Sequence, residues 1–179
     1  SGTVVVNISG ASSSTVGEGI IVRDTAAGGD ISVTTGAVTA LAGGKDGIDV
    51  QAQSLTGDVT IVANGDVKAG NAGIVGAIFP AGGTGNVAVT ANGAIDARFG
   101  VDAENFGSGN TSVTTVGPIN VTTGNGIFAQ TSGGNIAVTA GSVTSTATTA
   151  IVAKNVLGAA GTGTIDVTLT AGRTLIANA

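Results

Sequence analysis

The side chains in this sequence best suited to acid-base chemistry are a few carboxylates and one arginine. Asp102 and Glu104 are close in sequence, Arg98 precedes them, and Asp49 is a further acid. Paired carboxyl groups can act as general acid and base, and polysaccharide-cleaving enzymes use them, often beside a cation. The alternative is a surface ion-pair cluster that contributes less than about 1 kcal/mol. No wide acidic cleft is indicated, so we predict that the chain is not an enzyme and has no catalytic residues.

Two other acids raise the question of a cation site. Asp30 and Asp58 occupy equivalent places in the repeat described below, and the same place is later held by Asn86, Asn110, Asn135 and Thr164. Calcium takes roughly six to eight oxygen ligands, and no further acid is fixed nearby. We therefore favour a solvated turn column in which the Asn side chains form a hydrogen-bonded ladder. A weak Ca²⁺ site at Asp30 and Asp58 stays open, and otherwise we predict no metal and no cofactor.

These residues recur because the sequence is a repeat array. One glycine marks the start of each repeat, at intervals of 24 to 29 residues: Gly2, Gly29, Gly57, Gly85, Gly109, Gly134 and Gly163. Apolar residues alternate with small or polar ones inside each repeat. Repeats of this length predict a solenoid, in which each coil buries its apolar side chains only against neighbouring coils.

Three short alternating patterns occur in each repeat and predict three columns of inward side chains. The first pattern supplies Val4/Val6, Ile31/Val33, Val59/Ile61, Val87/Val89, Thr111/Val113, Ile136/Val138 and Ile165/Val167. The second supplies Val38, Val67, Ile95, Ile119 and Val143, with Ser12 in the first repeat and Leu175 in the last. The third follows a Gly or Ala step and supplies Ile20, Ile48, Ile74, Val101, Ile127 and Ile151.

These patterns predict an all-β fold for residues 1–179. We expect a right-handed, single-stranded parallel β-helix with about seven rungs of three short strands, forming one domain. A leucine-rich repeat would need a Leu-x-x-Leu-x-Leu pattern that the chain lacks. A β-sandwich would have longer strands and would not keep a Gly-Ile register through successive coils.

Composition and charge exclude several classes of function. The net charge is −5 with only six Lys and Arg, which argues against binding to nucleic acid or to an anionic membrane surface. No apolar run approaches the ~20 residues that span a bilayer, so we expect no direct membrane insertion of this segment. The chain has no Cys and no His, which excludes disulfides and removes the commonest metal ligand.

One family resemblance covers nearly the whole chain. Gly126-Ile127-Phe128-Ala129, Gly134-Asn135-Ile136-Ala137-Val138 and Gly141-Ser142-Val143 resemble the degenerate repeat of bacterial autotransporter passenger domains, the type V secreted adhesins. The resemblance implies an extracellular or cell-surface scaffold or adhesin segment, attached to the outer membrane through other segments. It also implies self-association or a host or cell-surface partner.

Two outward faces are candidates for binding. The third pattern and its neighbouring turns hold every aromatic residue and several aliphatic ones, a predicted partner face of Ile21, Val75, Phe79, Phe99, Phe106, Phe128 and Val152. The first pattern presents an outward column of Thr34, Thr90, Thr114, Thr139 and Thr168, interrupted by Val62. This column resembles the Thr-rich surfaces of ice-binding β-solenoids, although Thr is also common on exposed strands. An ice-binding protein is thus the alternative function, and a carbohydrate-active enzyme a further one.

Two more expectations test the proposed register. Lys68 and Asp96 should lie about one strand spacing apart on the same face. At the ends, the last repeat has no third pattern after Leu175, and no capping segment precedes Gly2. Uncapped coils expose apolar core and strand edges, so we expect either a longer parent β-helix or end-to-end stacking of copies.

Overall fold

The computed structural model describes residues 2–25, 28–156 and 163–177, and in this part of the chain the regular structure consists of twenty strands. All pairings between them are parallel, and they form three sheets. Each coil contributes one strand to each sheet in turn. The predicted all-β solenoid is therefore confirmed, with six complete coils and a seventh for which the described residues form two strands.

The strands of each sheet follow one another at intervals of one coil. The first sheet contains β1 (Val4–Ile8), β4 (Ile31–Thr35), β7 (Val59–Ala63), β10 (Val87–Ala91), β13 (Thr111–Thr115), β16 (Ile136–Ala140) and β19 (Ile165–Leu169). The second contains β2 (Ser12–Ser14), β5 (Val38–Ala40), β8 (Val67–Ala69), β11 (Ile95–Ala97), β14 (Ile119–Val121), β17 (Val143–Ser145) and β20 (Leu175–Ala177). The third contains β3 (Ile20–Asp24), β6 (Ile48–Ala52), β9 (Ala72–Ile78), β12 (Phe99–Asn105), β15 (Ile127–Thr131) and β18 (Ile151–Asn155).

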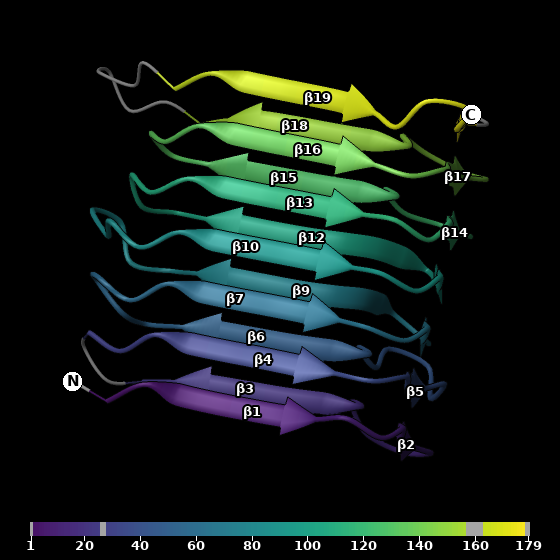
Figure 1. Ribbon diagram of the computed structural model, residues 1–179, viewed down its shortest axis with the longest axis horizontal. Coiled ribbons are helices and arrows are strands. Elements are labelled where there is room, and N and C mark those ends of the chain that lie inside the picture. The colour runs from purple at the N-terminus through teal and green to yellow at the C-terminus, as the bar shows by residue number, and fades with distance from the viewer. Residues whose placement is uncertain (1, 26–27, 157–162, 178–179) are drawn as a thin grey trace.

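The three sheets enclose a flattened section with two long sides and one short side. In Figure 1 the first sheet faces the viewer with its strands running to the right, and the third sheet lies behind it and runs back to the left. The short second sheet closes the right-hand end, and the coils rise from the N-terminus to the C-terminus. This winding is right-handed, as expected for parallel crossovers.

The inward columns have the predicted register. Val4 pairs with Ile31, Ile31 with Val59 and Val59 with Val87, and the column continues through Thr111 and Ile136 to Ile165. The side chains of all three sheets meet in one core of Val, Ile and Ala, most of it fully buried. Thr111, the polar exception, is also buried, and its hydroxyl donates to the Gln130 carbonyl at 2.8 Å. The column tolerates this residue because its polar atom has a partner.

Glycines form columns at the corners because adjacent coils approach too closely there for a Cβ atom. At the corner before the first sheet, a Cβ on Gly109 would collide with the carbonyl oxygen of Gly85, and one on Gly85 with that of Gly57. At the start of a third-sheet strand, a Cβ on Gly100 of β12 would meet both the Gly126 carbonyl and the Ile119 side chain. None of these glycines has positive φ, so interatomic distance rather than backbone conformation requires them.

A polar corner at the end of the third sheet was not predicted from the sequence. Asn105 is fully buried; its amide nitrogen donates to the Gly85 carbonyl at 2.8 Å, and its oxygen accepts from the Gly107 amide at 2.9 Å. One coil later Thr131 donates to the Gly109 carbonyl at 2.7 Å. These side chains satisfy the backbone groups where the chain turns from the third sheet into the first.

Lys68 and Asp96 are paired neighbours on β8 and β11, and both side chains are exposed, as predicted. They do not form an ion pair. Instead an oxygen of Asp96 accepts a hydrogen bond from the Asn120 amide of the next coil at 3.0 Å.

Candidate functional site

The outward side of the third sheet brings most of the predicted partner face together. Its central column pairs Ile21 with Asp49, Asp49 with Val75, Val75 with Asp102, and then continues through Phe128 to Val152. The exposed fraction differs along it: Ile21 is exposed, Val75, Phe128 and Val152 are half-buried, and Asp49 is buried. The face is therefore not one continuous apolar patch.

Two aromatic residues lie where the strands of this sheet end. Phe79 follows β9 and Phe106 follows β12, and their rings stack with centroids 5.7 Å apart and planes 12° from parallel. Phe79 is exposed and Phe106 is half-buried. Stacking across one coil buries part of each ring and ties adjacent turns together.

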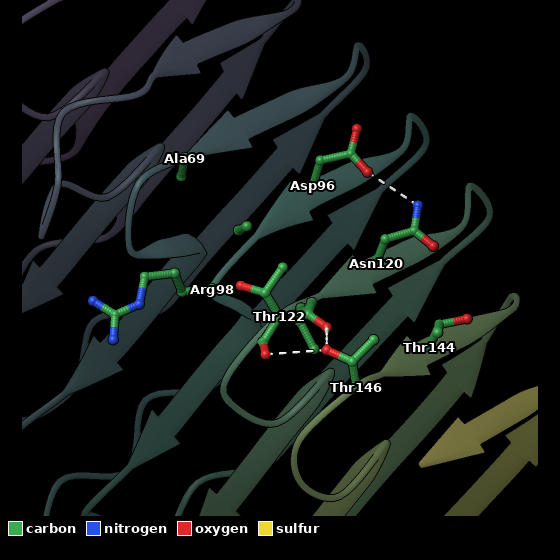
Figure 2. Close-up of a pocket in the computed structure, with 9 residues that line it drawn as sticks. Ala69, Asp96, Arg98, Asn120, Thr122, Thr144 and Thr146 are labelled. Carbon is green, nitrogen blue, oxygen red and sulfur yellow. Dashed lines mark hydrogen bonds between the residues drawn. The ribbon is translucent and has the colours of Figure 1, made fainter. Parts of the chain in front are cut away.

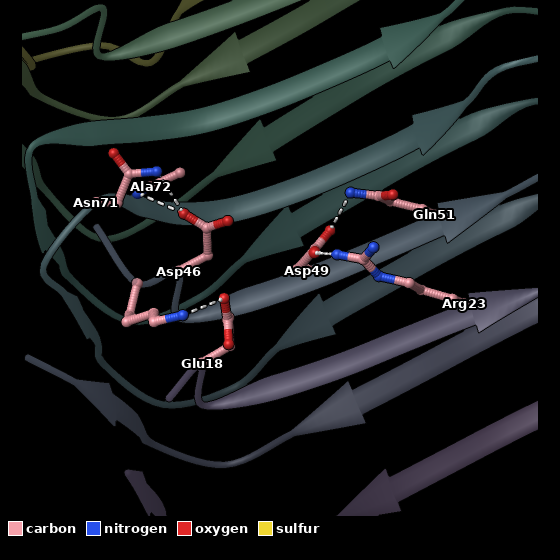
Figure 3. Close-up of polar contacts among 8 residues, drawn as sticks. Glu18, Arg23, Asp46, Asp49, Gln51, Asn71 and Ala72 are labelled. Carbon is pink, nitrogen blue, oxygen red and sulfur yellow. Dashed lines mark hydrogen bonds and ion pairs between the residues drawn. The ribbon is translucent and has the colours of Figure 1, made fainter. Parts of the chain in front are cut away.

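Asp49 is closed off by its neighbours. One carboxylate oxygen accepts from the Arg23 guanidinium at 2.6 Å and the other from the Gln51 amide at 2.8 Å, as Figure 3 shows. Only 2% of Asp49 is exposed, although it lies on the outer face of the sheet. Both carboxylate oxygens of Asp49 are therefore already hydrogen-bonded. The carboxylate holds the side chains of Arg23 and Gln51 in place and is not part of the candidate site.

Other polar contacts fasten the loop before β6 to this face. An oxygen of Asp46 accepts from the Asn71 side chain at 2.8 Å and from the Ala72 amide at 2.9 Å, and Lys45 pairs with Glu18 at 3.2 Å (Figure 3). Asp46 is half-buried by this arrangement. The loop thus places a further negative charge near the middle of the third sheet.

The predicted cluster of Arg98, Asp102 and Glu104 does not form. Arg98 leaves the corner between β11 and β12 on the side of the second sheet, where its Nε donates to the Thr123 hydroxyl at 3.3 Å. There it borders a shallow hollow of about 380 Å³ with Asp96, Asn120 and Thr146, and Figure 2 shows its guanidinium directed away from Asp96. Sequence proximity failed here because the chain turns a corner between Arg98 and the two acids.

Asp102 and Glu104 instead line a pocket of about 240 Å³, which we call the acidic pocket. Its lining comprises Phe99, Val101, Asp102, Glu104, Asn125 and Phe128. The ring of Phe99 packs directly against Gly124, where a Cβ atom would overlap the ring. The pocket thus combines two aromatic rings, two carboxyl groups and one amide.

The environment of the acidic pocket favours protonated carboxyl groups. Burial, together with the smaller effect of the charges on Glu104 and Asp46, raises the pKa of Asp102 from 3.8 to about 7. Burial also raises the pKa of Glu104. One oxygen of Asp102 is buried and has no hydrogen-bond partner. Such a group departs from the rule that buried polar atoms are paired.

The Asp30–Asp58 column is a hydrogen-bonded ladder, as expected, but in most of its bonds a backbone amide donates to a side-chain oxygen; the Asn86 side chain also donates to Asp58, and the Thr164 hydroxyl to Asn135. Asp30 accepts from the Asp58 backbone amide at 3.0 Å, and Asp58 accepts from the Asn86 backbone amide at 2.7 Å. The pattern continues through Asn110 and Asn135 to Thr164. In the described part of the chain, no three acidic residues gather in a group that could hold a metal ion.

The predicted Thr column is aligned on the outer face of the first sheet. Thr90 pairs with Thr114, Thr114 with Thr139 and Thr139 with Thr168, while Val62 separates Thr34 from the others. Thr114, Thr139 and Thr168 are exposed. Four hydroxyl-bearing side chains therefore repeat at one strand spacing along a parallel sheet.

Comparison with protein families, curated proteins and solved structures gave no match to this chain. Across the described residues, no helix is long and apolar enough to cross a membrane.

Proposed function

We propose that this chain is a non-enzymatic scaffold and adhesin segment of an extracellular or cell-surface bacterial protein, similar to an autotransporter passenger. The glycine corners support this proposal, because the motifs that resemble the passenger repeat coincide with the corners of the solenoid. Gly126 begins the Gly-Ile step into β15, and Gly134 stacks on the Gly109 carbonyl before β16. A rod of this kind holds a binding surface in a fixed shape along its length.

The observation that carries the binding role is the outer face of the third sheet. Phe99 and Phe128 line the acidic pocket, and the stacked rings of Phe79 and Phe106 follow the other ends of the strands, in a chain with only four Phe and no Tyr or Trp. Aromatic side chains that stay partly exposed are enriched where proteins bind partners. We infer that this face contacts a host or cell-surface partner.

A cell-binding assay tests the role of this face. The labelled chain should bind cultured animal or bacterial cells, and Phe99→Ala together with Phe128→Ala should reduce binding about tenfold or more, because aromatic anchors dominate such interfaces. Thr114→Ala on the first sheet is the matched control and should bind as the wild type does. Equal binding by the Phe variants would contradict the proposed face. Release of reducing ends from acidic polysaccharides would contradict the non-enzymatic role.

Self-association end to end is a second part of the proposal. The core-column residues of β19 and β20 are exposed, including Ile165 at 48%, Val167 at 45% and Leu175 at 46%. An apolar rung with unpaired strand edges can pair with a further coil of a longer solenoid or with another copy. Light scattering should show larger species with rising concentration, and Val167→Lys should abolish them while Thr168→Lys, on the outer side of the same strand, should not. A monomer at all concentrations would contradict stacking.

The aligned Thr column keeps ice binding as the second candidate. Its exposed hydroxyls repeat along a parallel sheet, as in the Thr-rich surfaces of ice-binding β-solenoids. Thermal hysteresis that is lost in Thr114→Leu and retained in Phe99→Ala would establish ice binding in place of adhesion.

A further inference from the structure

The acidic pocket has two carboxyl groups, and no cationic side chain among the described residues lines it. The ion pairs formed by described residues join Arg23 to Asp49 and Lys45 to Glu18, so those cations are already engaged. Arg98 points to the second-sheet side. In the outer column that contains Glu104, Lys154 is separated from it by Gln130 of the intervening coil.

The groups that face Asp102 on the neighbouring strands are uncharged. Val75 on β9 and Phe128 on β15 are its direct partners, with Ala77 and Gln130 beside Glu104. Asp46, from the loop before β6, adds negative charge. The pocket therefore complements a positive charge, because its lining contains two carboxyl groups and no cationic side chain.

The lining also determines what kind of cation fits. A bare divalent cation takes roughly six to eight oxygens, and the pocket supplies two carboxyl groups and one amide among aromatic rings. Phenyl rings favour an organic cation through cation–π attraction and an alkyl chain through apolar contact. An amino sugar would bring several hydroxyl groups for which the pocket offers only Asn125. A flexible alkyl chain that ends in an ammonium group matches the lining best.

We propose that the acidic pocket binds a lysine side chain of a partner protein, with its ammonium group facing Asp102 and Glu104. The alkyl stem packs against Phe99 and Phe128, and the ammonium group lies beside the two carboxyl groups. This inference rests on the proposed partner face, and it adds the chemistry of the contact. The bound ammonium favours the ionised carboxylate, so binding displaces the proton that Asp102 holds in the free protein.

An NMR titration of the isotope-labelled chain with Nα-acetyl-lysine amide tests the pocket directly. We expect saturable shifts at Phe99, Asp102 and Phe128, and binding about thirtyfold tighter near pH 8 than near pH 5.5, as the ionised fraction of a carboxyl with a pKa of about 7 rises. Asp102→Asn should weaken binding about tenfold or more, because it removes the charge and keeps the shape. Asp96→Asn, the same change at an exposed acid of the second sheet, should have no effect.

Two further probes distinguish a lysine side chain from other occupants of the pocket: one has no charge, and the other is an amino sugar. Equal binding of Nα-acetyl-norleucine amide, or binding of glucosamine in place of the lysine probe, would overturn the inference, as would loss of the pH dependence. The cell-binding assay separates this result from the proposed function. Cell binding that needs Phe99 and Phe128, without lysine binding, overturns the inference alone. Lysine binding with unchanged cell binding by the Phe variants supports the pocket and contradicts the adhesive role.

Discussion

The Arg23 guanidinium lies 2.6 Å from the Asp49 carboxylate on the next coil, with half of the arginine side chain exposed and almost none of the aspartate. Removing the arginine leaves a buried charge held only by Gln51. We expect Arg23→Ala to lower the free energy of unfolding by about 1–3 kcal/mol, less than for a fully buried pair because water reaches the arginine. Urea unfolding measures this change.

Lys45→Ala is the matched control, since it breaks the pair with Glu18, whose side chain is more exposed than that of Asp49. It should lower the free energy of unfolding by less than Arg23→Ala does, because exposed ion pairs contribute little. A cost for Arg23→Ala no larger than that for Lys45→Ala would show that Asp49 is not effectively buried.

The carboxyl of Asp102 should make stability depend on pH. Because its pKa is raised to about 7 in the folded state, the folded protein holds this proton more tightly than the unfolded chain. The resulting stabilisation amounts to roughly 4 kcal/mol. It is complete below about pH 4 and is lost as the pH rises through about 7. Asp102→Asn is neutral at every pH, so it should match the wild type near pH 4 and be more stable near pH 8. Thermal melts across this range, with Asp96→Asn as control, test the prediction; a constant difference would contradict it.

The corner glycines should tolerate no side chain. In Gly109→Ala the new Cβ would overlap the Gly85 carbonyl, and the coils would have to separate. We expect a loss of about 2–4 kcal/mol in the free energy of unfolding. Gly43→Ala, where no atom lies within 4 Å of the new Cβ, should be nearly neutral. Similar costs for both variants would show that the corners are looser than described.

Calcium should not stabilise the Asp30–Asp58 column. One oxygen of each acid already accepts a backbone hydrogen bond from the next coil. Too few free oxygens are left for a hard cation. The melting temperature should be the same in calcium and in a chelator, because an ion that binds the folded state would raise it. A calcium-dependent increase that Asp58→Asn abolishes would establish a site.

The sequence alone determined the coil register. Glycine recurs where coils touch and branched residues recur where side chains point inward, so a local pattern repeated seven times identifies equivalent positions without any coordinates. Each inward column, such as that from Val4 to Ile165, follows directly from this pattern. The pairing of Lys68 with Asp96 followed from the same count of residues.

Only the tertiary structure decided what the polar side chains do. Asp49 and Asp102 occupy equivalent outward positions, yet one is enclosed by Arg23 and Gln51 while the other lines a pocket with an unpartnered oxygen. Arg98 turned to another face, and Asn105 became a buried corner residue. Long side chains such as Arg23 and Arg98 reach the next coil, so their partners Asp49 and Thr123 lie 26 and 25 residues away in sequence. Their environment is set by neighbouring coils, which a local repeat does not encode.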